Sequence, residues 1–308
     1  MRFTVEYPTG SPGFSPAFLE PGEMLRFVAA VEASGVDALA FTEHPAPSKK
    51  WLDHGGHESF DSLTALAFCA SATVRVKLMP YLLVLPYRNP LLAAKQIATV
   101  DILSGGRVIL AVGTGYLRSE FAALGVGFDE RNELMDEAIA VVQQIWNGEP
   151  MTFDGRNFTA IGQVSVPPPQ QLPHPPLWFG GNSRRARRRA ATFGQGWAPL
   201  MIDADVARTI RTPAIASITQ LRVAIDDLRL LADEAGRDSA LIDVQVQWSR
   251  SADIEADPAG LLDLLFELAA VGVTWVVIRP PIDDVGRAIA AIYRYGELVI
   301  EQARSLAE

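Results

Sequence analysis

The sequence contains a single cysteine, Cys69, among 308 residues. One thiol cannot form an intramolecular disulfide, which favours a reducing compartment. The neighbours of Cys69 at 66–70 are apolar, as is typical of a small core residue on a helix. No apolar run approaches the roughly 20 residues that a membrane-spanning helix needs, and the first residues lack the apolar segment of a signal peptide. We therefore expect a cytoplasmic protein that does not bind a membrane.

The chain also has fewer positively than negatively charged residues. The chain has 27 Lys and Arg against 36 Asp and Glu, a net charge of −9. Nucleic-acid binding depends on a basic face that neutralises phosphates, so nucleic acid is excluded as the main partner. Apolar residues are plentiful, at 49% of the chain, which is enough for a large core. The length fits one large α/β domain or two small ones.

Apolar strand-like runs alternate with helical patterns along the chain. Strands are expected at 3–7, 38–42, within 74–85, and at 108–112, 177–179, 197–200, 242–248 and 274–278. Helices are expected at 21–34, 60–73, 89–103, 129–146, 183–193, 214–235, 258–271 and 283–306. The strand at 108–112 has no polar residue, a pattern typical of a parallel strand covered on both faces. This alternation predicts a (β/α)8 TIM barrel, one α/β domain over 1–308, rather than an open doubly wound sheet.

Two segments do not fit the repeat. Residues 46–59 form a polar loop after the second strand, and residues 148–176 carry aromatic residues followed by a proline cluster. We interpret the second segment as an inserted hairpin and an extended crossing. Long loops of this kind often bind ligands, so both segments are candidates for a lid that selects the substrate.

Candidate catalytic residues follow the second strand. Barrel enzymes place their chemistry at the carboxyl ends of the strands. His44 stands there and suits general acid–base work, because its ordinary pKa is close to neutral; the alternative is a rim histidine that only caps a loop. Glu43 is either a second catalytic group or the partner of a nearby arginine. Arg279, after the eighth strand, either binds a phosphate or carboxylate or forms a structural ion pair.

Two glycine-rich turns lie at the same end of the predicted barrel. Glycine lets the backbone approach a ligand closely, and the turn after the fourth strand is formed by Gly113, Thr114 and Gly115. The turn after the fifth strand leads into a helix, whose N-terminus can bind an anion. This second turn consists of Gly180, Gly181, Asn182 and Ser183. It is either a phosphate site or a plain capped turn.

Two clusters of charged residues and histidines are interpreted without a ligand. Five arginines within 184–189 favour a solvated helix face, the alternative being attraction of an anionic cofactor tail. Asp53, His54, His57 and Glu58 resemble a zinc-binding group. No regular helix is expected there to fix metal geometry, so we predict no metal site.

These motifs together resemble the bacterial luciferase-like flavin and deazaflavin oxidoreductases, and most closely the actinobacterial branch that uses coenzyme F420. The resemblance covers nearly the whole chain. It is carried by Phe41-Thr-Glu-His-Pro45, Leu83-Val-Leu-Pro-Tyr-Arg-Asn-Pro90, Ser104-Gly-Gly-Arg107, Val112-Gly-Thr-Gly115, Phe179-Gly-Gly-Asn-Ser183 and Gly194-Gln-Gly-Trp197.

The resemblance implies a TIM barrel that binds its cofactor at the C-terminal rim. It implies that His44 is the active-site histidine and that Tyr81, Leu82 and Leu83 form a bulge behind the cofactor ring, often with a non-proline cis peptide. It makes the turn at 113–115 a cofactor contact and the turn at 180–183 the phosphate loop. Deazaflavin-dependent sugar-phosphate dehydrogenases have a glutamate where this chain has Tyr116. That departure argues against glucose 6-phosphate as the substrate and leaves Tyr116 to hydrogen-bond a substrate or to pack.

The leading hypothesis is therefore an F420-dependent oxidoreductase that transfers hydride to or from a small organic substrate, with His44 handling the proton. The alternative is a reduced-FMN monooxygenase that uses O2, and a third hypothesis is a flavin- or F420-binding protein without turnover. No motif names the substrate. A homodimer is the expected assembly, because dimers are the commonest homo-oligomers.

Overall fold

The computed structural model describes residues 1–247 and 258–305. Its main sheet contains eight parallel strands and a short extra one. The eight are β1 (Arg2–Glu6), β2 (Ala38–Phe41), β3 (Lys77–Pro80), β5 (Leu110–Gly113), β8 (Leu177–Gly180), β9 (Gly196–Ala198), β10 (Asp243–Gln247) and β11 (Trp275–Ile278). The extra strand β4 (Leu83–Val84) pairs with β5. A parallel bridge between Leu78 and Val108 joins the two ends of this sheet, so the eight strands close into a TIM-like barrel, as predicted.

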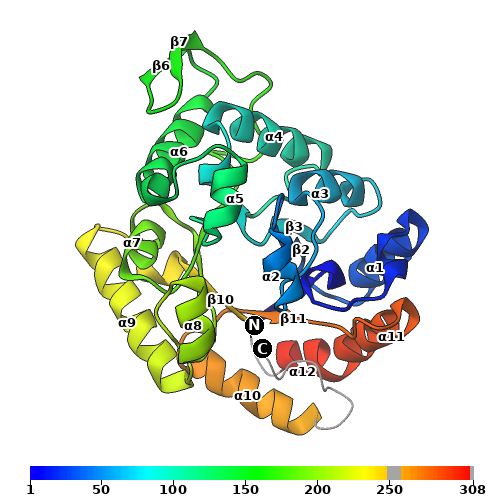
Figure 1. The fold of residues 1–308 in the computed structure, drawn as a ribbon. Helices are drawn as coiled ribbons and strands as arrows, with labels where there is room; N and C mark the ends of the chain where they lie inside the picture. The colour runs from blue at the N-terminus through cyan, green and yellow to red at the C-terminus, as the bar shows by residue number, and fades with distance from the viewer. Residues whose placement is uncertain (248–257, 306–308) are drawn as a thin grey trace.

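The larger helices form a ring around the strands (Figure 1). They are α1 (Pro21–Ala33), α3 (Ser62–Ala70), α4 (Pro90–Leu103), α6 (Arg131–Ile145), α7 (Arg184–Phe193), α9 (Ile218–Glu234), α10 (Pro258–Ala270) and α11 (Val285–Tyr295). Each corresponds to a predicted helix. The last one is followed by a π-helical turn (Gly296–Ile300) and by α12 (Glu301–Ser305). Trp248 and Leu306, the predicted ends of a strand and a helix, lie outside the described residues.

Three short helices were not expected from the sequence. They are α2 (Lys49–Asp53), α5 (Arg118–Ala123) and α8 (Ala204–Ile210). Each follows the carboxyl end of a barrel strand, and Figure 1 shows all three inside the ring of larger helices. Single 3-10 turns occur at Pro8–Gly10, Pro16–Leu19, Leu85–Tyr87, Phe128–Glu130 and Ser239–Leu241. The short helices and the turn at Phe128–Glu130 bring residues distant in sequence to the rim.

Large aromatic side chains fill the barrel interior. Trp178 and Trp275 meet edge to face, with ring centroids 5.2 Å apart. Their neighbours from β2 and β5 are small, including Ala38, Ala40 and Ala111. Gly196 faces Trp178 so closely that a Cβ there would lie 2.3 Å from the indole ring. This packing fills the barrel interior, so a ligand site is expected above it, at the carboxyl ends of the strands.

The inserted segment forms the predicted hairpin, in which β6 (Met151–Asp154) pairs with β7 (Thr159–Gln163) in antiparallel fashion. No residue of 148–176 lines the cavity described below, so the expected role of this segment as a lid stays a prediction. The segment follows the C-terminal end of α6, and helices of a barrel run opposite to the strands, so it begins at the far end from the rim. Asp101, near the end of α4, accepts hydrogen bonds from the backbone N–H groups of Gln170 and Gln171. Figure 1 shows the hairpin at the outer edge of the molecule, beside α6.

The serine–glycine–glycine–arginine segment belongs to this same far end. Arg107 is 8% exposed, and its guanidinium donates to the carbonyl oxygens of Ala70, Thr73 and Val76. Gly105 and Gly106 adopt positive φ angles of 69° and 77°, which turn the chain from α4 into the barrel. Arg107 therefore ties the loop after α3 to the start of β3, and its motif is structural.

Candidate functional site

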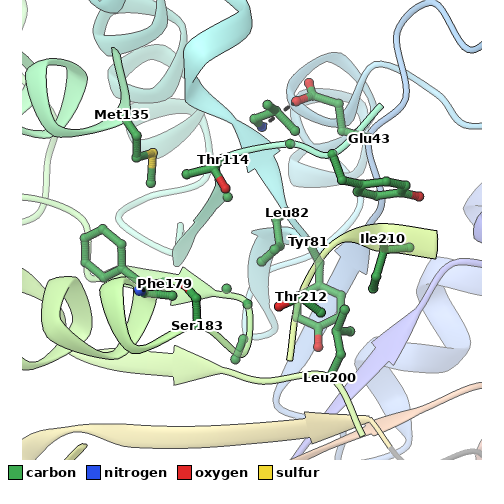
Figure 2. A pocket seen from close by; sticks show the side chains of 18 of the residues that line it. Glu43, Tyr81, Leu82, Thr114, Met135, Phe179, Ser183, Leu200, Ile210 and Thr212 are labelled. Carbon is green, nitrogen blue, oxygen red and sulfur yellow. Dashed lines mark hydrogen bonds between the residues drawn. The ribbon is translucent and has the colours of Figure 1, made fainter. Parts of the chain in front are cut away.

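A cavity of about 430 Å³ opens at the carboxyl ends of the strands. It brings together most of the residues singled out in the sequence, and Figure 2 shows part of its lining. The predicted residues that line it are Glu43, His44, Leu82, Gly113, Thr114, Gly115, Tyr116, Gly180, Gly181, Ser183 and Arg279. Leu83 and Asn182 were predicted to bind the cofactor but do not line the cavity. Leu83 packs in the hydrophobic core, and the buried Asn182 uses its amide to bind the backbone of Leu200 and Pro213.

His44 lies between a buried carboxylate and a phenol. Its Nδ1 is 3.1 Å from Oε2 of Glu120, and its Nε2 is 3.3 Å from the hydroxyl oxygen of Tyr116. An ionised carboxylate only accepts, so Glu120 selects the tautomer in which Nδ1 carries the proton. His44 and Tyr116 both line the cavity, whereas Glu120 does not. The Nε2 lone pair faces the cavity, where it accepts from the Tyr116 hydroxyl and can take or return a proton.

Glu120 is held ionised by its hydrogen bonds. The side chain is fully buried, yet it accepts from the backbone N–H of Ala46 at 2.9 Å and from the hydroxyl of Tyr87 at 2.9 Å, in addition to His44. Burial acts to raise the pKa of Glu120, but these three bonds outweigh it, so the pKa lies below its ordinary value. The same carboxylate raises the pKa of Tyr116 to about 12, after the larger effect of burial. Tyr116 therefore stays protonated at neutral pH and can donate a hydrogen bond.

The loop at 46–59 packs against His44, and its role in selecting the substrate stays a prediction. The ring of Trp51 lies 4.6 Å from the ring of His44, and the ring of His57 lies 5.1 Å from it. Ser59 holds the end of the loop against the backbone of His44, because its hydroxyl accepts from the His44 N–H and donates to the His44 carbonyl oxygen. Burial and the nearby His44 lower the pKa of His57 to about 4, so His57 is neutral at physiological pH. His44, His57 and Tyr116 make this side of the cavity aromatic.

Glu43 occupies a different position from His44. Its two carboxylate oxygens accept from the Arg88 guanidinium at 2.7 and 3.0 Å, and the second also accepts from the backbone N–H of Val84. The geometry thus matches the ion-pair alternative, and the expected catalytic role of Glu43 is not supported. By holding Val84, Glu43 fixes the chain that leaves the bulge at the end of β3.

The wall beside this bulge is formed by Leu82 and two glycines. The peptide bond between Tyr81 and Leu82 is cis, as the resemblance implies. A Cβ on Gly180 would lie 2.1 Å from the Cδ1 atom of Leu82, and a Cβ on Gly113 would lie 3.0 Å from it. Only glycine leaves room for Leu82 at these two points. Figure 2 shows Leu82 among the cavity-lining side chains of Thr114, Phe179 and Ser183.

Four of the five arginines of α7 form ion pairs with neighbouring helices. Arg185 and Arg189 bind Asp136 of α6, each at 2.6 Å, and Arg184 and Arg187 bind Asp227 of α9. The predicted solvated face is thus confirmed for the exposed Arg184, Arg185 and Arg188. It is wrong for Arg187 and Arg189, which are largely buried. Arg185 and Arg189 also line the cavity next to Ser183, whose hydroxyl accepts from the Ala186 N–H and caps the helix. This end of the cavity is positively charged.

Arg279 lies at the cavity with a carboxylate already beside it. Its Nε and Nη2 atoms donate to the buried Glu6 at 2.9 and 3.3 Å. The side chain keeps 42% of its surface exposed. Glu6 positions the guanidinium, and the exposed part stays available to a substrate group.

The histidine- and acid-rich loop does not assemble a metal site. Nδ1 of His54 binds the carbonyl oxygen of Lys50, and Nδ1 of His57 binds that of Glu58. Within residues 1–247 and 258–305, no three His, Cys, Asp or Glu side chains come close enough together to hold a metal ion.

The cavity fits a flavin or deazaflavin. Such cofactors consist of a flat ring and a phosphate-bearing chain. Leu82 offers an apolar platform that glycine backbone approaches from two strands. The capped N-terminus of α7, with Arg185 and Arg189, supplies the charge that a phosphate needs.

Sequence reasoning missed Glu120, Tyr87 and Arg131. Glu120 comes from α5, a helix too short to show a periodic pattern, and its pairing with His44 spans 76 positions of the chain. Tyr87 lies inside the segment quoted for the family resemblance, but nothing in the sequence showed its partner. Arg131 begins α6, and no motif in the sequence singled it out.

Comparison with known proteins agrees with the fold. The model of the family described as luciferase-like monooxygenase matches residues 1–263. The chain is 34% identical over 141 residues to the FMNH2-dependent dimethylsulfone monooxygenase of Pseudomonas putida, a match that covers 45% of this chain and 39% of that protein. It is 30% identical over 183 residues to the F420-dependent glucose-6-phosphate dehydrogenase of Gordonia bronchialis, covering 58% and 52%. The matches thus span about half the length of these relatives or less.

A solved structure shows the same fold over almost the whole chain. The monooxygenase RslO1 from Streptomyces bottropensis superposes with a TM-score of 0.81 and 20% identity, covering 98% of this chain and 100% of that one. In the part of the chain that the structure describes, no helix has the length and apolar character needed to cross a membrane. The barrel, the cis bulge, the rim histidine and the family match lead to one conclusion: the chain belongs to the luciferase-like monooxygenase family.

Proposed function

We propose that this protein is a coenzyme F420-dependent oxidoreductase that acts on a small organic substrate. The observation that carries the proposal is the shape of one cavity. A histidine with a fixed tautomer stands at its aromatic end, and a helix N-terminus with two arginines stands at the other. The 30% identity to an F420-dependent dehydrogenase supports this choice of cofactor.

Each wall of the cavity has a separate task. A bound deazaflavin supplies a ring carbon that gives or accepts a hydride. Leu82 supports one face of the ring, and the turn at 180–183 with α7 holds the phosphate. His44 takes or returns a proton through Nε2, while Glu120 keeps its Nδ1 proton in place and stabilises the imidazolium. The loop at 46–59 excludes water from this end through Trp51 and His57.

The residues around His44 favour a substrate of low charge. Tyr116 stands directly after the Gly113–Gly115 turn and can hydrogen-bond a carbonyl or hydroxyl oxygen. His57 adds neutral surface to the cavity, and Trp51 packs against it. Arg279 can bind a single carboxylate or phosphate, since Glu6 already neutralises part of its charge. We infer a ketone, alcohol, imine or enone of modest size rather than a sugar phosphate.

A turnover assay tests this proposal. The protein is mixed without oxygen with reduced F420 and a panel of ketones, imines and enones, and the return of oxidised F420 is followed by absorbance. His44→Asn should lower the rate by roughly 10²- to 10⁴-fold, the usual contribution of a general acid or base. His54→Asn is the matched control, because His54 is exposed and binds only a nearby backbone carbonyl. If His44→Asn turns over as fast as the wild type, His44 does not handle the proton.

A reduced-FMN monooxygenase is the second candidate, favoured by the 34% identity to an FMNH2-dependent enzyme. Labelled dioxygen with a flavin reductase separates the two, because only a monooxygenase places the label in the product. A protein that binds cofactor without turnover would give no product with either cofactor. The homodimer expected from the sequence stays a prediction, which light scattering can check.

A further inference from the structure

Three arginines surround one phenylalanine ring at the charged end of the cavity. Phe128 stands on a 3-10 turn between α5 and α6, and it lines the cavity. The guanidinium carbons of Arg131, Arg118 and Arg211 lie 4.0, 4.3 and 5.4 Å from the centre of its ring. These residues come from α6, α5 and the end of α8, so the fold assembles the group. We call it the Phe128 arginine cluster.

The cluster carries positive charge that its neighbours do not neutralise. Arg131 donates to the carbonyl oxygen of Phe128, and no ion pair of Arg131 or Arg211 occurs among the residues that the structure describes. Arg118 pairs with Asp129, but both side chains are more than half exposed, where an ion pair contributes little. Burial lowers the pKa of Arg131, and Arg118 and Arg211 lower it further against the opposing effect of Asp129. The three guanidinium groups therefore repel one another unless an anion lies among them.

The cluster is continuous with the phosphate turn. Arg131 and Arg211 line the same cavity as Gly181 and Ser183. Thr212, the residue after Arg211, accepts a hydrogen bond from the backbone N–H of Asn182 at 3.1 Å. Arg211 itself has a left-handed backbone, with φ 58°, at the C-cap of α8. This conformation is uncommon for a residue with a side chain and here carries the chain past the cavity.

Resting on the function proposed above, we infer that the Phe128 arginine cluster binds the carboxylates that follow the cofactor phosphate, and so favours F420 over FMN. The chain of F420 continues beyond its phosphate into several glutamates, whereas that of FMN ends at the phosphate. Guanidinium groups bind carboxylates through paired N–H donors, and the ring of Phe128 holds these groups in place by cation–π contact. A phosphate in the turn at 180–183 directs the following carboxylates to Arg211 and Arg131.

The test compares two ligands and three variants by fluorescence titration, without any substrate. The ligands are F420 and the same molecule with its glutamates removed. Arg131→Gln and Arg211→Asn, the latter chosen because Asn tolerates a left-handed backbone, should each weaken F420 binding by about tenfold, the effect of losing one charge-assisted contact. Both variants should bind the glutamate-free ligand within about twofold of the wild type. Arg188→Gln is the matched control, since Arg188 is exposed on α7 and does not line the cavity.

The outcomes separate this inference from the proposed function. The inference is overturned if the wild type binds both ligands equally, or if the variants weaken the binding of both ligands equally. Either result would mean that the cluster does not bind the glutamates, while F420 binding itself would stand. If the wild type binds neither ligand, the proposed function fails. Added salt provides a second readout: F420 binding by the wild type should fall with salt more steeply than binding by the two variants.

Discussion

Replacing Glu120 by Gln should change which nitrogen of His44 carries the proton. The amide has one acceptor oxygen in place of two carboxylate oxygens. If that oxygen keeps the Ala46 N–H, the NH2 group faces His44 Nδ1 and the hydroxyl of Tyr87. The NH2 group can only donate, so Nδ1 must become an acceptor and the proton moves to Nε2. In Glu120→Gln, Nε2 of His44 therefore presents an N–H group to the cavity in place of a lone pair.

The size of the effect follows from the lost hydrogen bond. A bond to a charged group contributes about 1.5–3 kcal/mol, which corresponds to a tautomer bias of about 10- to 150-fold. We expect kcat to fall by this factor. Cofactor affinity should change by less than about twofold, because Glu120 does not line the cavity. The free energy of unfolding should fall by about 1–3 kcal/mol, the cost of buried groups left without their partners.

Nitrogen NMR of labelled histidine reads the tautomer directly, and steady-state kinetics reads kcat. Asp101→Asn is the matched control, because Asp101 is another fully buried carboxylate that accepts hydrogen bonds, but at the opposite end of the barrel. It should lose stability while keeping the His44 tautomer and kcat. If Glu120→Gln keeps the proton on Nδ1, or keeps kcat, then Glu120 does not set the tautomer and the reasoning fails.

Three further predictions concern other parts of the structure. Arg107→Ala should lower the free energy of unfolding by about 3–5 kcal/mol, measured by urea denaturation, because it leaves buried carbonyl oxygens without a donor; a loss under about 1 kcal/mol would contradict this. His57 has a pKa of about 4 when folded, against about 6.5 when unfolded. The folded state thus binds fewer protons between these values, and stability should fall by at most about 3 kcal/mol as the pH drops from 6.5 to 4. His57→Asn should flatten that slope, and an unchanged slope would refute the assignment. Gly180→Ala should push Leu82 into the cavity and weaken cofactor binding by about 5- to 150-fold, equivalent to 1–3 kcal/mol of overpacking, whereas Gly22→Ala, which meets open space, should leave it unchanged.

Local patterns were enough to predict the barrel. Continuous apolar strands such as Leu110–Gly113, alternating with capped helices, identified eight repeats, and rim chemistry follows from the fold itself. His44 and the two glycine turns were placed in this way, since each stands directly after a strand. Leu82 was placed only by the family resemblance. The order of elements also distinguishes the two ends of a barrel: a loop that follows a strand lies at the rim, and a loop that follows a helix lies at the opposite end. The segment at 148–176 follows a helix and precedes a strand, so that rule already places it away from the rim.

Long-range partners could not be predicted. The choice of Glu43 between catalysis and an ion pair depended on Arg88, which reaches it from 45 positions away. Glu120 and all of the Phe128 arginine cluster except Arg131 come from short helices and turns above the rim, whose sequences carry no periodic signal. Their chemistry arises only when the barrel brings α5, α6 and α8 to one cavity. The arginines of α7 show the same limit, because Asp136 and Asp227 lie on separate helices.

Fluorescence titration of the cofactor-free protein with F420 and with FMN tests the central claim most directly. We predict saturable F420 binding with Kd in the micromolar range or below, and FMN binding at least about tenfold weaker, since FMN lacks the carboxylates that the Phe128 arginine cluster receives. The absence of F420 binding at micromolar concentration would contradict the account.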